Sequence, residues 1–150
     1  MASSLSHLVH HLVFSTKDRK NLITQELQRR LYDYIIATAN NHGGDILEIG
    51  GIEDHIHILI KIKPARCVAD IIQLIKANSS KWINEQSILR DRFAWQSGYG
   101  AFSVSASNIP AIRSYIQRQE EHHRTQSFIN EFLEFLTKNG IVFDQRFLWN

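Results

Sequence analysis

The sequence predicts an α+β fold in which helices pack on an antiparallel sheet. Residues 55–63 alternate strictly between two kinds of side chain, which is typical of a strand. Apolar positions at helical spacing recur in several other segments, and only two prolines interrupt the chain. The length of 150 residues, with 43% hydrophobic and 21% charged residues, favours one globular domain over residues 1–150.

The first half of the chain combines strand patterns with one amphipathic helix. A run rich in Val, Leu and Phe opens the chain, and leucines at helical spacing follow a polar turn. In chain order, the expected elements are a strand over residues 5–15, a helix capped by Thr24 that ends just before Gly43, and a strand over residues 45–52 that Gly50 and Gly51 break.

The segment over residues 55–63 has the clearest pattern. Successive side chains of a strand point to opposite faces, so Ile56, Ile58, Ile60 and Ile62 share one face. His55 and His57, with two lysines, share the other. We expect the isoleucine face to be core, and the histidine face to be polar and open to a ligand.

The second half adds one strand and further helices. The expected elements are a helix over residues 68–75 that continues in broken form to Trp82 and Ile83, a strand over residues 99–105, a helix capped by Asn108 with Pro110 in its first turn, and a helix over residues 128–136 that ends at Asn139-Gly140. The order β-α-β-β-α-β followed by helices predicts a ferredoxin-like sandwich, with helices on one sheet face and the other face free.

Charge is distributed unevenly along the chain. Residues 56–118 hold nine Lys or Arg against three Asp or Glu, a net +6, whereas the segments on either side are each −2. A basic block of this kind favours an anionic partner such as nucleic acid, although a solvated basic helix face would give the same composition. A single cysteine, Cys67, and no apolar run of about 20 residues favour a cytoplasmic protein.

Two constellations carry possible chemistry. His55 and His57 project from the same strand face, with Cα atoms about 7 Å apart, so two imidazoles can converge on one metal ion. Tyr115 and Gln119 are four residues apart, which places a phenol and an amide oxygen one turn apart on one helix face. Taken singly, each pair is also compatible with ordinary surface residues, and neither identifies a function.

Together the two pairs resemble a known family. The His55-Ile56-His57 strand and the later Tyr115-to-Gln119 helix are similar to the single-tyrosine HUH transposases of small bacterial insertion sequences, which move as single-stranded DNA. The similarity runs nearly end to end, and longer strings also carry it: residues 12–17, 80–83, 93–104 and 147–149.

The resemblance implies a mechanism, with roles for particular residues. His55, His57 and Gln119 would bind a divalent metal ion, Mg²⁺ or Mn²⁺, and Tyr115 would attack the scissile phosphate to form a 5′-phosphotyrosine. Family members are dimers, so a homodimer is implied, with Tyr115 of one subunit completing the histidine site of the other. Because imidazole ligands suit manganese better than magnesium, the ligand type ranks Mn²⁺ first. No residue stands out as the proton acceptor for the tyrosine.

The implied substrate is single-stranded DNA with hairpin ends. Basic side chains would bind its phosphates without reading bases. The residues proposed for this are Lys61, Lys63, Arg66, Lys81, Arg113 and Arg118, with Lys76, Arg90 and Arg92 as further members of the basic block. Trp95 and Tyr99 are candidates to stack on unpaired bases, and Trp82 is better explained as core. His7, His10 and His11 are expected to be structural or neutral, and His122 is not expected to be a ligand.

Two other functions compete with the transposase. A ferredoxin-like sheet can hold RNA or single-stranded DNA without cutting it, but such domains read bases with aromatic residues where this chain has histidines and lysines. A metal-dependent hydrolase could use the same histidines with water as the nucleophile. The Tyr115→Phe variant separates these possibilities, because only the transposase would lose cleavage and keep DNA binding.

Overall fold

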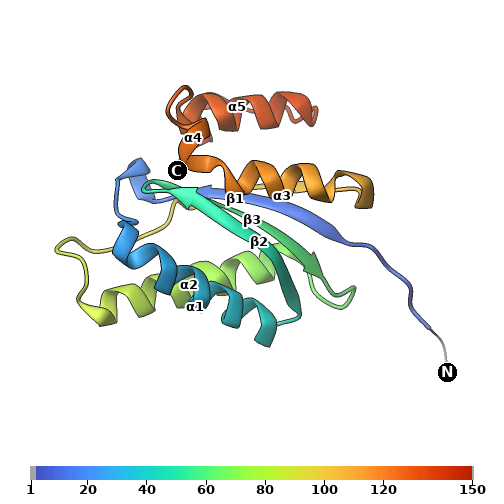
Figure 1. Ribbon diagram of the computed structural model, residues 1–150, viewed down its shortest axis with the longest axis horizontal. Helices are drawn as coiled ribbons and strands as arrows, with labels where there is room; N and C mark the ends of the chain where they lie inside the picture. The colour runs from blue at the N-terminus through green and yellow to red at the C-terminus, as the bar shows by residue number, and fades with distance from the viewer. Residues whose placement is uncertain (1–2, 150) are drawn as a thin grey trace.

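The computed structural model describes residues 3–149 and contains a four-stranded sheet between two layers of helices (Figure 1). All strand pairs are antiparallel, in the order β2-β3-β1-β4. The strands are β1 (Val9–Ser15), β2 (Gly44–Ile52), β3 (His55–Ile62) and β4 (Gly100–Ser103), and the helices of four or more residues are α1 (Gln25–Asn41), α2 (Val68–Gln86), α3 (Ile109–Gln117), α4 (Gln119–His122) and α5 (Phe128–Lys138). Short 3-10 turns occupy Lys17–Arg19, Ala106–Asn108 and Gln145–Phe147.

The α+β class and the order of the first elements are as predicted. Thr24 caps α1 as expected, because its hydroxyl accepts a hydrogen bond from the Leu27 amide at 3.2 Å. Gly43 follows the helix with a φ of 87°, a conformation that glycine adopts without strain. The predicted cap at Asn108 is wrong in one respect, since its side chain makes no capping hydrogen bond.

Several expected element bounds differ from the structure, and β4 spans Gly100–Ser103 where residues 99–105 were expected. The first strand begins at Val9 and not at residue 5, and α2 is one unbroken helix to Gln86. The glycine pair does not break β2. A Cβ on Gly50 would lie 2.6 Å from the Ile116 carbonyl oxygen, so the glycine lets α3 approach the sheet closely.

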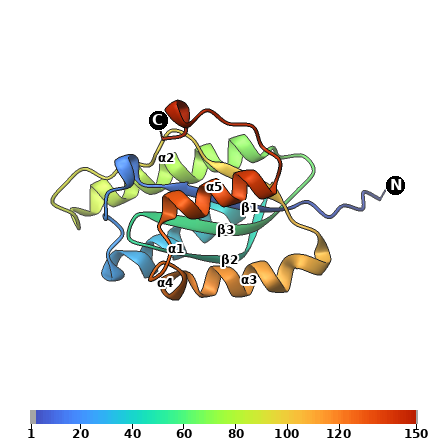
Figure 2. The same ribbon diagram turned by 90° about the horizontal axis from the view of Figure 1, so that it is seen from above.

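The two sheet faces are both covered, which corrects the prediction of a free face. α1 and α2 lie on one face, and α3, α4 and α5 lie on the other (Figures 1 and 2). The four isoleucines of β3 are buried in the main core beneath α1 and α2, as predicted. On the opposite face, two smaller apolar clusters around Phe132 and Ile116 hold the C-terminal helices against the sheet. The histidine face is therefore an interior.

Among residues 3–149, none of the helices combines the length and the apolar composition needed to cross a bilayer.

Candidate metal and tyrosine site

His55 and His57 lie beneath the C-terminal helices and have no exposed surface. Their side chains point away from the isoleucine core, as the alternation of β3 predicts. Glu131, on α5, faces both rings: its Oε1 is 2.9 Å from His57 Nε2 and 3.4 Å from His55 Nε2. His123 approaches the other carboxylate oxygen at 3.3 Å. One possible ligand atom from each of these four residues lies within 4.8 Å of the other three.

Gln119 joins the same cluster. Its Oε1 is 3.0 Å from His55 Nε2 and 3.0 Å from His123 Nε2, and its side-chain amide donates to Glu131 at 3.3 Å. The prediction that Tyr115 and Gln119 share one helix is wrong, because α3 ends at Gln117 and α4 begins at Gln119. The break at Arg118 still leaves both side chains directed at Glu131.

Tyr115 completes the cluster from the end of α3. Its hydroxyl donates a hydrogen bond to Glu131 and lies 3.2 Å from His122 Nε2. The centre of its ring is 5.7 Å from that of His57. Burial, together with the neighbouring Glu131 carboxylate, raises the pKa of Tyr115 well above its usual value. The structure thus brings the four sequence-predicted residues, His55, His57, Tyr115 and Gln119, into one place.

A second layer of side chains contacts the two β3 histidines from outside the cluster. The Asp54 carboxylate accepts a hydrogen bond from His55 Nδ1 at 2.7 Å. His11 Nε2, from the neighbouring strand β1, lies 2.8 Å from His57 Nδ1 and is itself buried. Both Nε2 atoms therefore face the cluster, and both Nδ1 atoms face a partner.

The electrostatic environments of the two histidines are opposite. Burial opposes a charge on His55, but its hydrogen bonds to Asp54 and Glu131 outweigh that effect and raise its pKa to about 9. Burial lowers the pKa of His57 to about 4, against the attraction of Glu131. For Glu131 itself, burial favours the neutral acid, but hydrogen bonds from His123, His55 and His57 hold its pKa well below the usual range.

The donor set fits a divalent metal ion. Three imidazole nitrogens, a carboxylate and an amide oxygen converge from β3, from α4 and the residue that follows it, and from α5. Imidazole suits zinc, copper, nickel and iron, the carboxylate and amide oxygens also suit manganese, and magnesium prefers oxygen ligands and its own waters. The outer partners at His55 and His57 match the usual arrangement of metal-binding histidines, whose second ring nitrogen is hydrogen-bonded to a neighbouring group.

Sequence reasoning missed three members of this site. Glu131 gives a recognisable signal, since it is a carboxylate on the apolar face of α5 between Phe128 and Phe132. His123 follows Gln119 by four residues, a spacing at which helical side chains meet. His11 was expected only as structural or neutral, and nothing in its local sequence points to His57. His122, not expected as a ligand, contacts the tyrosine hydroxyl.

The basic residues do not form one face. Lys61 lies near the far end of β3 and Lys63 just beyond it, about 20 and 26 Å from His55 by strand geometry. Arg113 is 3.8 Å from the Glu48 carboxylate, so part of its charge is balanced, and Arg118 is exposed between α3 and α4. The lysines share the strand face of the histidines, as the alternation predicts, but they lie far from the metal-binding cluster, and their contact with DNA stays a prediction.

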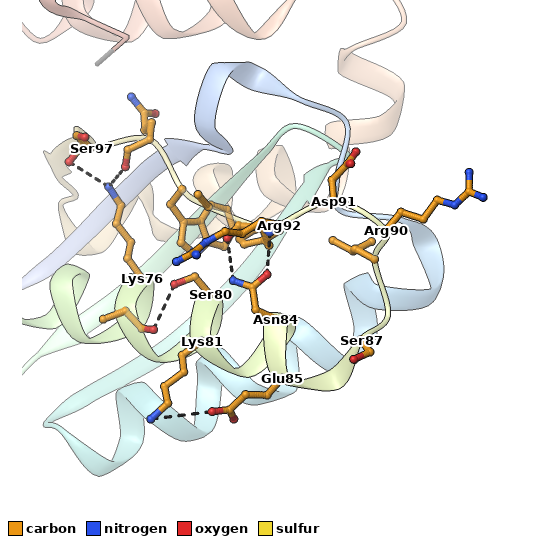
Figure 3. Close-up of a pocket in the computed structure, with 16 residues that line it drawn as sticks. Lys76, Ser80, Lys81, Asn84, Glu85, Ser87, Arg90, Asp91, Arg92 and Ser97 are labelled. Carbon is orange, nitrogen blue, oxygen red and sulfur yellow. Dashed lines mark hydrogen bonds and ion pairs between the residues drawn. The ribbon is translucent and has the colours of Figure 1, made fainter.

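Lys81 lines a separate groove, with a volume of about 900 Å³, formed by α2 and residues 87–97 (Figure 3). Lys76 ties this segment to α2 by donating to the carbonyls of Gln96 and Gly98, so it is structural. Arg92 lies along the groove, and Arg90 extends away from it. Trp95 is 8% exposed and packed in the core, which contradicts its predicted role in base stacking, whereas Tyr99 is 41% exposed.

Two smaller clefts adjoin the buried cluster. Gln119 lines one of about 420 Å³ beside Gly50 and Tyr32, and His123 lines another of about 300 Å³ beside Gln28 and Arg124. Both clefts lie along β2, the edge strand nearest α3 and α4. They bring open space to the Gln119 and His123 side of the site.

Comparison with known proteins defines the class to which this fold and site belong. Residues 4–119 match the family described as "Transposase IS200 like". The ISDra2 transposase TnpA of Deinococcus radiodurans is 23% identical over 119 residues, which cover 76% of this chain and 85% of that protein. The transposase for insertion sequence element IS200 of Salmonella typhimurium is 29% identical over 120 residues, covering 77% and 78%.

Solved structures share the fold. A putative transposase from Deinococcus radiodurans aligns with a TM-score of 0.65 at 22% identity, covering 79% of this chain and 95% of that one. The REP-associated tyrosine transposase bound to a REP hairpin aligns with a TM-score of 0.62 at 12% identity, covering 82% and 74%. The fold is thus that of the tyrosine transposases.

The protein is a transposase. More narrowly, because the family match covers most of the chain, it belongs to the IS200-like transposases, and the resemblance inferred from its sequence is confirmed. The matched segment contains His55, His57 and Tyr115 and ends at Gln119. His123 and Glu131 lie beyond it.

Proposed function

We propose that this transposase cuts and rejoins single-stranded DNA through a covalent 5′-phosphotyrosine on Tyr115, and so moves an insertion sequence with hairpin ends. The observation that carries the proposal is the position of the Tyr115 hydroxyl, which contacts the same Glu131 carboxylate that faces His55 and His57. A nucleophile and a metal-binding group at one carboxylate are the parts that phosphoryl transfer to a tyrosine requires.

In the proposed reaction, Tyr115 is the nucleophile and Glu131 is the proton acceptor. The Tyr115 oxygen attacks phosphorus, the bond to the 3′ oxygen breaks, and a 3′-hydroxyl is released as the phosphotyrosine forms. Glu131, which already accepts the phenol hydrogen bond, is placed to receive the tyrosine proton, and the departing 3′ oxygen takes up that proton to become the 3′-hydroxyl. The phosphotyrosine conserves the energy of the phosphodiester, so rejoining by attack of a 3′-hydroxyl needs no nucleotide cofactor.

We assign the metal ligands to His55 Nε2, His57 Nε2 and Gln119 Oε1, with His123 and Glu131 as further donors within reach. A bound divalent ion supplies Lewis-acid polarisation of the scissile phosphate. Of Mg²⁺ and Mn²⁺, the imidazole-rich donor set favours Mn²⁺.

We propose that the DNA is contacted at several separate surfaces. The candidate phosphate contacts are Lys61, Lys63, Arg66, Lys81, Arg113 and Arg118, of which all are exposed. A folded DNA end is supported by the structural neighbour described as bound to a REP hairpin. The clefts beside Gln119 and His123 offer room for a strand next to the cluster, on the side of the metal ligands.

The resemblance implies a homodimer with shared sites, and we keep the homodimer as a prediction. In a single chain, however, Tyr115 lies beside its own His57, so we propose that the tyrosine can serve its own subunit. Mixing His57→Ala subunits with Tyr115→Phe subunits separates the two arrangements. Sites completed within one chain give no recovery of DNA cleavage, whereas sites shared between subunits recover it.

The nucleophile is tested by incubating the protein with single-stranded DNA and Mn²⁺ and mapping any covalent adduct by mass spectrometry. We expect an adduct on Tyr115, and a Tyr115→Phe protein that binds the same DNA without forming one. Cleavage that persists in Tyr115→Phe would favour a hydrolase with water as nucleophile. An unmutated protein that binds DNA and never cuts it would favour a nucleic-acid-binding module.

A further inference from the structure

The two β3 histidines have outer partners of different chemistry. His55 Nδ1 faces the Asp54 carboxylate at 2.7 Å, and His57 Nδ1 faces His11 Nε2 at 2.8 Å. An ionised carboxylate only accepts hydrogen bonds, so His55 carries its Nδ1 hydrogen whatever happens at Nε2. A neutral imidazole nitrogen either donates or accepts, depending on the tautomer. The hydrogen bond at His57 Nδ1 can therefore reverse its direction, whereas the hydrogen bond at His55 Nδ1 cannot.

His57 needs a reversible hydrogen bond at Nδ1 because its Nε2 either donates to Glu131 or binds the metal ion. In the structure Nε2 lies 2.9 Å from Glu131 Oε1, and whenever no metal ion is bound a carboxylate there requires Nε2 to carry a hydrogen. A neutral His57 of this tautomer has its lone pair at Nδ1, so His11 must donate from Nε2. A metal ion at Nε2 requires the lone pair on that atom instead, and the ring hydrogen then moves to Nδ1.

We propose that His11 is a positioning residue that allows His57 to change tautomer when the metal binds, donating to His57 in the empty site and accepting from it in the loaded one. The inference rests on the metal site of the proposed function. Each ring carries one N–H in both states. When the metal binds, His57 Nε2 loses a hydrogen and His11 Nδ1 gains one. The hydrogen between the two rings moves from His11 Nε2 to His57 Nδ1.

The surroundings of His11 hold its ring in place for this role. Its ring packs edge-to-face against the rings of Phe102, Phe135 and Tyr115. The distances between ring centres are 6.2, 5.0 and 6.4 Å, respectively. The side chain is 1% exposed, and its strand pairs residue by residue with β3. A ring so enclosed keeps its Nε2 directed at His57, so the exchange is of hydrogens and not of ring orientation.

Long-range proton–nitrogen NMR of the ¹⁵N-labelled full chain reports the tautomer of each imidazole. Without metal we expect the Nε2–H form for both His57 and His11. With Zn²⁺, a diamagnetic probe, we expect the Nδ1–H form for both, while His55 keeps its Nδ1–H throughout. If zinc binds His57 Nε2 and His11 retains Nε2–H, the inference is overturned and the metal site stands. If zinc leaves both β3 histidines unchanged, the metal site fails and the inference with it.

Two substitutions test the role by affinity. His11→Leu removes both hydrogen-bonding capacities in an apolar setting, and we expect Zn²⁺ binding to weaken by about 10- to 100-fold. His11→Gln presents either an oxygen or an NH₂ group by rotating its amide, so its affinity should stay within about threefold of the unmutated chain. Asp54→Leu is the comparison for the NMR measurement: it should alter the His55 tautomer and also weaken Zn²⁺ binding, but leave the tautomer change of His57 and His11 intact. Equal affinity in His11→Leu, with thermal unfolding showing that it folds, would overturn the proposal.

Discussion

The two faces of β3 are both buried from His55 to Ile60 and are chemically opposite. Ile56, Ile58, Ile60 and Ile62 enter a hydrocarbon core beneath α1 and α2, whereas His55 and His57 enter a polar cluster beneath α3, α4 and α5. Buried polar groups cost stability unless they satisfy one another. On the histidine face they do so around a single carboxylate, Glu131. One face holds the fold together, and the other is an interior arranged for chemistry.

Substitution of adjacent residues on the two faces should give the largest and most clearly different effects. We expect His57→Ala to weaken Mn²⁺ binding by at least about 100-fold through loss of a ligand, and Ile58→Ala to destabilise the fold by about 3 kcal/mol through a core cavity. Thermal unfolding with and without Mn²⁺ separates these effects, because a ligand at 100 times its Kd stabilises by about 2.7 kcal/mol. Ile58→Ala should keep the metal-induced rise in Tm from a lower starting value. A rise retained by His57→Ala would contradict the assignment.

The charge on His55 predicts how the metal-free protein responds to pH. Its pKa of about 9 exceeds the unfolded value of 6.5, so its stabilising contribution is complete below pH 6.5 and is lost as the pH rises through about 9. At 1.36 kcal/mol per pKa unit the contribution is about 3 kcal/mol. Denaturant unfolding of the metal-free chain and of His55→Gln should therefore differ in slope between pH 6.5 and 9. Parallel curves would exclude a charged His55.

Two glutamates on α5 allow the role of the Glu131 carboxylate to be tested against a matched control. Glu131 is buried in the cluster, and Glu134 lies less than one turn further on and is exposed. We expect Glu131→Gln to weaken Mn²⁺ binding about tenfold and to slow adduct formation, because the amide neither carries the charge nor accepts the tyrosine proton. Glu134→Gln should match the unmutated chain in both calorimetric titration and the adduct assay. Equal behaviour of the two variants would remove Glu131 from the site.

The smallest effect is expected in the groove of α2. Arg92→Ala should weaken single-stranded DNA binding a few-fold and reduce the slope of log affinity against log salt by about 0.7, since one phosphate contact would be lost. Lys76→Ala, which removes a structural hydrogen-bonding group, should instead lower thermal stability. Fluorescence anisotropy at several salt concentrations measures the slope, and an unchanged slope in Arg92→Ala would exclude that contact.

The sequence predicts the isoleucine face better than the histidine face because the two faces depend on different information. Period-two alternation and helical spacing are local, and they correctly give the order of the strands, the position of α1 and the burial of Ile58, although some strand bounds differ. The covering of the histidine face depends on where the chain goes after residue 105. No local pattern tells whether α3 to α5 fold back over the sheet or leave it free.

The residues of the candidate site also fall into two groups, those that the sequence identifies and those that only the tertiary fold brings into contact. His55, His57, Tyr115 and Gln119 were identified by spacing and by the family resemblance, and the structure gathers them. Glu131 and His123 lie beyond the family-matched segment, and His11 lies 46 residues before His57. Their contacts are produced by the tertiary fold, which also explains why no proton acceptor for the tyrosine was evident in the sequence.

The central claim is that the buried polar cluster holds a divalent ion beside Tyr115. Crystals of the unmutated protein soaked in Mn²⁺ test it most directly through the anomalous scattering of the metal. The account predicts one strong peak bonded to His55 Nε2 and His57 Nε2, close to the Tyr115 hydroxyl. A cluster without a peak, in crystals whose other histidines have bound manganese, would contradict it.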